Sequence, residues 1–174
     1  MKPDPVQAKP GYSSLRVHRW SASGADYFVT FNLKRPASGL CERAMLAALE
    51  AQSVMLESEG HWVVRTWVVM PDHVHVLFTL GTDSELAKVM RLFKGRLSPR
   101  LRAHRLAWQD GYYEHHLRPD EDRLPVFLYI FLNPYRAGLI STNEKWPGYY
   151  CAAEDWDWFG ALTNSDVPFP EWLK

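Results

Sequence analysis

The chain has 174 residues, of which 47% are hydrophobic and 23% charged, a composition typical of a folded domain with a sizeable core. Its 20 Lys and Arg residues balance its 20 Asp and Glu residues, so the net charge neither indicates nor excludes a polyanionic partner. Two cysteines, Cys41 and Cys151, lie outside any Cys-x-x-Cys pair, which excludes a disulfide framework and a cysteine zinc cluster. With no signal-peptide core and no long apolar run, we expect one cytoplasmic domain over residues 1–174.

The N-terminal half predicts an arm, a strand, a helix and a hairpin. Residues 1–14 are rich in Pro, Lys, Gly and Ser, which predicts a flexible arm. DYFVTFNL (26–33) is rich in aromatic and β-branched residues and predicts a strand, whereas residues 40–58 combine good helix formers with apolar residues near helical spacing. HWVVRTWVVM (61–70) and HVHVLFTL (73–80) predict two strands, which a short Pro-Asp turn joins into an antiparallel hairpin.

A second helix is predicted after the hairpin. Thr82-Asp83-Ser84 offers an N-cap, and Pro99 is expected to end or kink the helix. Residues 106–118, which are aromatic and rich in histidine, can hold a short strand. The apolar face of the helix consists of Leu86, Val89, Met90, Phe93 and Leu97.

The last predicted helix begins after Asp120-Glu121-Asp122, where acidic residues suit the helix dipole. Asn133-Pro134 is expected to bend or break this helix, and Gly138 to terminate it. Residues 141–174 form a Trp- and acid-rich extension without clear periodicity. The element order, β-α-β-β-α-(β)-α, predicts an α+β fold in which an antiparallel sheet carries helices on one face.

Two histidines stand in the second strand of the predicted hairpin. His73 and His75 point to one face, whereas Val74, Val76 and Phe78 point to the other, which we expect to be the core. Such a pair can converge on one divalent ion, although two surface histidines on a half-exposed sheet give the same pattern. A metal site needs further ligands, and with no cysteine nearby an oxygen ligand favours Mg²⁺ or Mn²⁺ over structural Zn²⁺.

Tyr129 and Asn133 lie one turn apart on the last predicted helix and therefore share a face. Together they offer one site a hydroxyl nucleophile and an amide ligand. A tyrosine at the boundary of the core and an asparagine that precedes a helix-breaking proline are the alternative interpretation of the same spacing.

Four segments in order carry a resemblance to a known family: VVMPDHVHVLF, MRLFKGRLSPR, WQDGYYEHHLR and YIFLNPYRAGL. Over about residues 26–140 the chain resembles the single-tyrosine HUH transposases, and within them the REP-associated tyrosine transposases. The resemblance implies that His73 and His75 hold a divalent ion, that Asn133 completes the metal site, and that Tyr129 is the catalytic tyrosine.

The family fold is a ferredoxin-like or RRM-like antiparallel sheet with helices packed on one face, which agrees with the predicted element order. The family reaction is cleavage and rejoining of single-stranded DNA beside hairpins formed by palindromic repeats. The resemblance therefore implies a transposase that uses Mg²⁺ or Mn²⁺, passes through a 5′-phosphotyrosine intermediate, binds DNA hairpins and acts as a monomer or homodimer. Pro99 departs from the family pattern, in which the basic helix continues.

The segment from Leu86 to Arg118 has eight basic and two acidic residues, although the whole chain is neutral. Basic residues interleaved with aromatic residues suit phosphate contact and base stacking, whereas a solvated helix face usually mixes charges of both signs. The predicted DNA contacts are Lys88, Arg91, Lys94, Arg96, Arg100 and Trp108.

Two other functions are compatible with parts of this pattern. A non-catalytic RRM-like domain would bind nucleic acid without needing His73, His75, Tyr129 and Asn133. A metal-dependent hydrolase in which Tyr129 only orients a water would retain activity after Tyr129→Phe.

The extension carries Glu154, Asp155 and Asp157 among tryptophans. One hypothesis is that it folds over the basic segment and competes with DNA. The alternative is that it wraps around the domain and completes the core.

Overall fold

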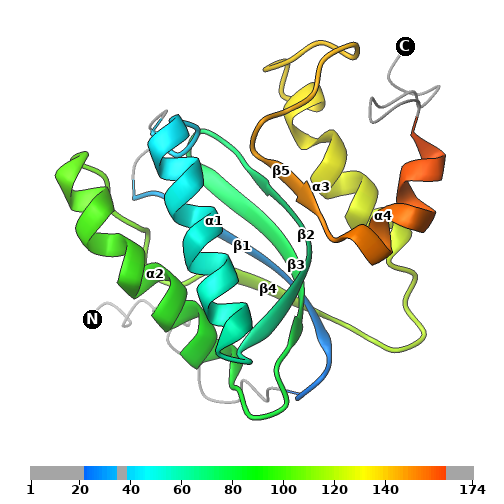
Figure 1. Ribbon diagram of the computed structural model, residues 1–174, viewed down its shortest axis with the longest axis horizontal. Helices are drawn as coiled ribbons and strands as arrows, with labels where there is room; N and C mark the ends of the chain where they lie inside the picture. The colour runs from blue at the N-terminus through cyan, green and yellow to red at the C-terminus, as the bar shows by residue number, and fades with distance from the viewer. Residues whose placement is uncertain (1–21, 35–38, 164–174) are drawn as a thin grey trace, which may run out of the picture.

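The computed structural model describes residues 22–34 and 39–163, so the predicted arm (1–14) lies outside the described residues. These residues form one antiparallel sheet in the order β4-β1-β3-β2-β5 (Figure 1). The strands are β1 (Asp26–Asn32), β2 (Trp62–Val69), β3 (His73–Leu80), β4 (Tyr113–Leu117) and β5 (Tyr149–Cys151). The helices are α1 (Arg43–Ser58), α2 (Leu86–Ala103), α3 (Leu124–Arg136) and α4 (Ala153–Phe159).

The predicted α+β class and antiparallel sheet are confirmed. The β-α-β-β-α-β order of the first six elements, with strands placed β4-β1-β3-β2, is that of a ferredoxin-like fold, and β5 extends the sheet beside β2. None of the helices in residues 22–34 and 39–163 is long and apolar enough to span a lipid bilayer.

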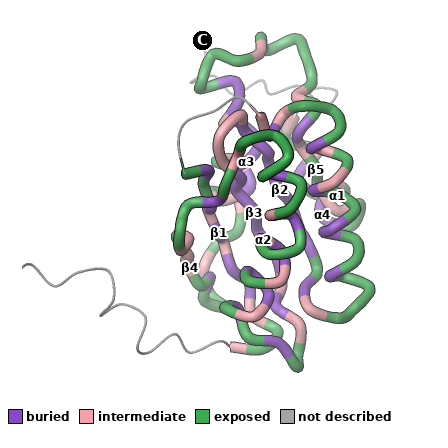
Figure 2. Tube along the Cα trace, turned by 90° about the vertical axis from the view of Figure 1, so that its left-hand side faces the viewer, coloured by how far each residue is buried: buried purple, intermediate pink, exposed green. Residues whose placement is uncertain are grey.

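Hydrophobic layers cover both faces of the sheet, which corrects the expectation of helices on one face. Val74, Val76 and Phe78 pack against α1 and α2, as the alternation in β3 predicts. Leu77, on the opposite face, packs in a second layer with residues of α3 and α4. Figure 1 shows the α1–α2 pair and the α3–α4 pair on different sides of the strands. Figure 2 shows buried residues along the strands and exposed residues on the outer sides of the helices.

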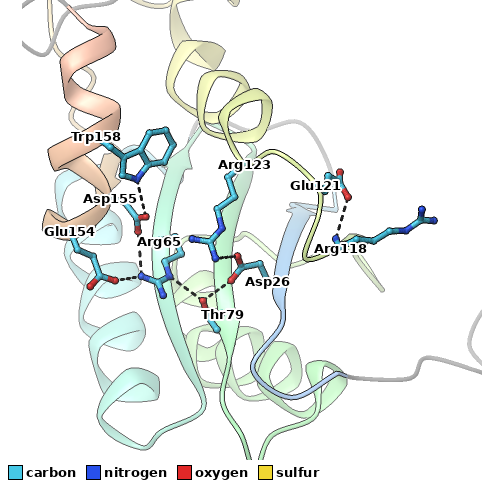
Figure 3. Close-up of polar contacts among 9 residues, drawn as sticks. All are labelled: Asp26, Arg65, Thr79, Arg118, Glu121, Arg123, Glu154, Asp155 and Trp158. Atoms are coloured by element: carbon cyan, nitrogen blue, oxygen red, sulfur yellow. Dashed lines mark hydrogen bonds and ion pairs between the residues drawn. The ribbon is translucent and has the colours of Figure 1, made fainter.

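The C-terminal extension supplies part of this second layer. Phe159 of α4 is fully buried against Phe127 and Phe131 of α3. Glu154 and Asp155 form ion pairs with Arg65 of β2, so both lie against the sheet (Figure 3). The extension therefore completes the core through α4, whereas residues 164–174 lie outside the described part.

A network of polar side chains fixes the start of α3. Arg123, which precedes the helix, lies 2.5 Å from a carboxylate oxygen of Asp26 at the start of β1. The other Asp26 oxygen accepts a hydrogen bond from Thr79 (2.6 Å), whose hydroxyl in turn accepts one from Arg65 (3.0 Å). Figure 3 shows these side chains bridging the sheet between α3 and α4. Asp122 accepts a hydrogen bond from the Leu124 amide, as acidic residues at a helix start predict.

One expected helix boundary is wrong, and at two prolines the structure excludes one of the expected outcomes. The N-cap of α2 is Glu85 rather than Thr82-Asp83-Ser84, and it makes no side-chain capping bond. Pro99 lies inside α2 and Pro134 inside α3, so neither proline ends its helix. Pro99 is tolerated because it and Gly95, the residue four earlier whose carbonyl loses its helical partner, are both exposed. Gly138, with a φ of 66°, follows α3 as expected.

Trp108 lies in the first hydrophobic layer, 7% exposed, with its ring 5.1 Å from that of Phe31. We predict that Trp108→Ala lowers the free energy of unfolding by about 3–5 kcal/mol, because a buried indole leaves a large cavity. Urea denaturation followed by circular dichroism measures this loss. Val54→Ala, at a side chain 60% exposed, is the control and should change stability by less than about 0.5 kcal/mol. A Trp108→Ala protein as stable as the control would contradict this placement.

Candidate active site

The two predicted histidines converge on one point. They lie on the face of β3 that is turned toward α3, and their Nε2 atoms are 3.0 Å apart. Their rings meet at 77°, with centroids 4.6 Å apart. Two imidazole nitrogens at this separation have the spacing of neighbouring ligands on one ion with bonds of about 2.1 Å. The pair therefore fits a shared cation, as the sequence pattern predicts.

The outer nitrogen of each histidine is held by a neighbour. The Nδ1 atom of His73 lies 2.7 Å from a carboxylate oxygen of Asp72, and the Nδ1 atom of His75 lies 2.7 Å from the hydroxyl of Thr30. When these oxygens accept from Nδ1–H, each Nε2 keeps its lone pair for a cation. Both positioning residues were missed from the sequence. Asp72 adjoins His73 and could have been found there, whereas Thr30 reaches His75 only through the β1–β3 register.

Burial determines the charge of His75, which is only 5% exposed. Desolvation, and after it the electrostatic interaction with His73, lowers the pKa of His75 to about 3, although Asp72 opposes the shift. At neutral pH the imidazole is therefore uncharged. A neutral imidazole is the form that binds a metal.

The predicted nucleophile reaches the same point from α3. The Tyr129 hydroxyl lies 3.5 Å from Nε2 of His75, and the ring stands edge-on to His75 with centroids 5.0 Å apart. Phe28 of β1 contacts both rings, each at a centroid distance of 5.7 Å. Tyr129 is nonetheless 41% exposed, so a large substrate can reach its hydroxyl. Tyr129 and the two histidines thus form one site, which is open to solvent on one side.

Asn133 follows Tyr129 by one helical turn and is half-buried. Its side-chain amide makes no hydrogen bond to another described residue, which leaves its oxygen available. Within the described residues, no third Cys, His, Asp or Glu joins the histidine pair to form a metal-binding group. If the Asn133 oxygen joins the two imidazoles, as the resemblance implies, an oxygen ligand of this kind would favour Mg²⁺ or Mn²⁺.

The predicted DNA contacts lie elsewhere. Helix α2 packs on the sheet face opposite His73 and His75, so its basic surface is separated from them by the sheet. Arg91 and Arg100 are exposed and Lys88 is half-exposed.

Three of the predicted contacts are already occupied by the protein itself. Arg96 bonds both carboxylate oxygens of Glu59 at 3.0 Å, and the Lys94 ammonium donates to the carbonyls of Gln109 and Gly111, each at 2.7 Å. Trp108 is buried, so the expectation that it stacks on a DNA base is wrong. Because Tyr112 and Tyr113 follow Trp108 in the sequence, the pattern does not show that its side chain points into the core.

Comparison with known proteins matches the middle of the chain to a family. Residues 37–120 match the family model described as transposase, IS200-like. Residues 37–120 belong to the IS200-like transposase family. For these residues, the resemblance to the IS200-like transposases that the sequence motifs indicate is thereby confirmed.

Two proteins similar to this chain carry a more specific description. The REP-associated tyrosine transposase of Escherichia coli (strain K12) is 25% identical over 130 residues, which cover 74% of this chain and 78% of that protein. A solved structure of a REP-associated tyrosine transposase bound to a REP hairpin superposes with a TM-score of 0.66 at 24% identity, covering 77% of this chain and 81% of that one. The family match ends before α3, so the placement of Tyr129 and Asn133 relies on the geometry given above.

We predict that the His75 imidazole stays neutral as the pH falls from about 8 to about 4, because its pKa is lowered to about 3 by burial. Long-range ¹H–¹⁵N NMR spectra of the metal-free protein report the charge and tautomer of each ring, and His75→Gln identifies the signal. Protonation of His75 near pH 6 would show that its ring is hydrated rather than buried.

Proposed function

We propose that this chain is a metal-dependent transposase that cuts and rejoins single-stranded DNA beside hairpins of palindromic repeats. Tyr129 is its nucleophile, and His73, His75 and Asn133 hold Mg²⁺ or Mn²⁺. One observation carries the proposal: the Tyr129 hydroxyl lies 3.5 Å from a histidine nitrogen that is itself 3.0 Å from the nitrogen of a second histidine. A nucleophile and two cation ligands from separate elements thus meet at one point.

Each residue has a distinct part in the proposed reaction. The Tyr129 hydroxyl loses its proton and its oxygen forms a bond to the phosphorus of a phosphodiester. The bond from phosphorus to the 3′ oxygen breaks, and that 3′ oxygen takes up a proton. The products are a 5′-phosphotyrosine and a free 3′-hydroxyl, which can later reverse the step without ATP. A cation held by His73, His75 and Asn133 would polarise the phosphate and offset the charge that develops on its oxygens. Free tyrosine has a pKa of about 10, so it needs such an activating environment at neutral pH.

The form of the substrate follows from the site and from the relatives. Tyr129 is exposed on α3 beside the histidines, and a flexible single strand can bend its phosphate toward the hydroxyl more easily than a stiff duplex can. The similar proteins are described as REP-associated, and one of them as bound to a REP hairpin. Hairpin DNA with a single-stranded flank is therefore the substrate to test.

We predict that the chain forms a covalent adduct with such DNA and that Tyr129→Phe abolishes it, because phenylalanine has no oxygen to attack phosphorus. The double variant His73→Ala/His75→Ala should also lose the adduct, through loss of the cation. The measurement is a denaturing gel of 5′- and 3′-labelled oligonucleotides, taken from beside the gene and incubated with Mg²⁺ or Mn²⁺. Only the label downstream of the cut should move with the protein.

Tyr150→Phe is the matched control, since Tyr150 is exposed to the same extent as Tyr129 but lies on β5, away from the histidines. Tight binding without an adduct on every hairpin would support the non-catalytic binding domain instead. Cleavage that persists in Tyr129→Phe would support a hydrolase in which tyrosine only orients a water.

We further predict that Thr30→Val weakens Mn²⁺ binding about 10- to 100-fold without unfolding the protein, because it removes the partner of His75 Nδ1 and keeps the side-chain shape. Isothermal titration calorimetry measures the affinity. Thr79→Val is the control, since Thr79 lies on the same sheet face but bonds Asp26 and Arg65 rather than a histidine. Equal Mn²⁺ affinity in the two variants would remove Thr30 from the site.

A further inference from the structure

A single row of residues crosses the sheet on the face that carries the site. The strand register aligns Tyr149 of β5, Val68 of β2, His75 of β3, Thr30 of β1 and Tyr113 of β4. His75 is in the middle of this row, and Tyr113 is at its end, on an edge strand of the sheet. Adjacent strands are about 4.8 Å apart, so the Tyr113 and His75 backbones are separated by about 10 Å. Tyr113 therefore borders the site although it comes from a distant segment.

Tyr113 is also the most exposed aromatic side chain among the described residues, at 60%. Its ring packs on Phe28 edge-to-face, with centroids 6.2 Å apart. Phe28 in turn contacts Tyr129 edge-on and stacks on His75. A continuous aromatic surface thus leads from the nucleophile to the open edge of the sheet, and Tyr113 is its solvent-exposed end.

The other aromatic and histidine side chains of this segment have different surroundings. Trp108 is buried in the first hydrophobic layer, and Tyr112 packs against that same layer. His115, the next residue on the face of Tyr113, bonds Glu121 at 2.7 Å, and His116 stacks on Tyr27 on the opposite face. Tyr113 is thus the one aromatic side chain of residues 106–117 that is exposed on the site's face of the sheet.

We propose that Tyr113, backed by Phe28, is a stacking platform for one unpaired base of the strand whose phosphate lies at His73, His75 and Tyr129. The inference rests on the proposed function and adds a substrate subsite to it. Aromatic side chains hold single-stranded nucleic acid in this way with little preference for sequence, because every base offers a flat face. The stacked base fixes the direction and position in which the strand crosses the site, so Tyr113 determines which phosphate reaches Tyr129.

The test compares Tyr113→Ala with Tyr113→Phe in the full chain. The probes are hairpin oligonucleotides with a single-stranded flank, each with one base near the cut replaced by an abasic residue. Tyr113→Ala should weaken binding of the intact oligonucleotide about 10- to 100-fold, as expected for loss of one stacked base, whereas Tyr113→Phe should retain it. One abasic position should weaken binding by the wild-type protein and have no further effect on Tyr113→Ala.

Tyr150→Ala is the matched control, because Tyr150 lies on the other edge strand with its side chain toward the opposite face, against Trp67. It should bind every probe as the wild type does. Circular dichroism verifies that all variants are folded, and an exposed position such as 113 should tolerate the change.

The outcomes separate this inference from the proposed function. A wild-type adduct together with unchanged binding by Tyr113→Ala would overturn the stacking platform and leave the transposase intact. Loss of the abasic effect in Tyr113→Ala without any wild-type adduct would support the platform and overturn the cleavage reaction. If the abasic residue adds the same loss to Tyr113→Ala as to the wild type at every position, the base does not lie on Tyr113.

Discussion

Strand β3 sends its side chains into a hydrophobic layer on each face of the sheet, so a polar group on it must find a hydrogen-bond partner or a ligand. His75 is the residue on which this constraint acts most strongly. Thr30 on the neighbouring strand satisfies one of its ring nitrogens, and burial keeps the ring uncharged. The second nitrogen is left at the margin of the α3 layer, beside His73 and Tyr129. The site is therefore where the second layer stops covering the sheet.

The position of Tyr129, the proposed nucleophile, depends on how α3 is attached to that sheet. Apolar side chains along α3 pack with those of α4 against the sheet, and the Arg123–Asp26 ion pair fixes the beginning of α3. Asp26 is only 8% exposed and is shared with Thr79, which links it to Arg65 and so to the acidic start of α4. Helix α4, which the sequence does not predict, thus stabilises the position of α3 by packing against it. A substitution in α4 can therefore affect the position of Tyr129 without touching the site.

The sequence predicts the elements that follow a single strong period and misses what depends on tertiary contact. The alternation in β3 identifies the histidine face and the core face, and the Tyr129–Asn133 spacing places both residues on one side of α3. The sequence does not show that α3 lies on the sheet face opposite α2. The pattern of an amphipathic helix indicates which of its sides is apolar, but not which face of the sheet that side packs against. The sequence also misplaces Trp108, for a different reason: an indole among aromatic and basic residues suits both a core and a nucleic-acid surface. Thr30 has no local signal at all, because its role comes from strand register.

The groups of this site come from distant parts of the chain. Thr30 and His75 are 45 residues apart, and a further 54 residues separate His75 from Tyr129. Such long-range pairing forms slowly, and domains fold as the chain is synthesised from its N-terminus. The histidines and Thr30 emerge from the ribosome before α3 does. Under the proposed roles, a nascent chain would therefore present the two imidazoles that hold a cation before it presents the tyrosine that attacks a DNA strand.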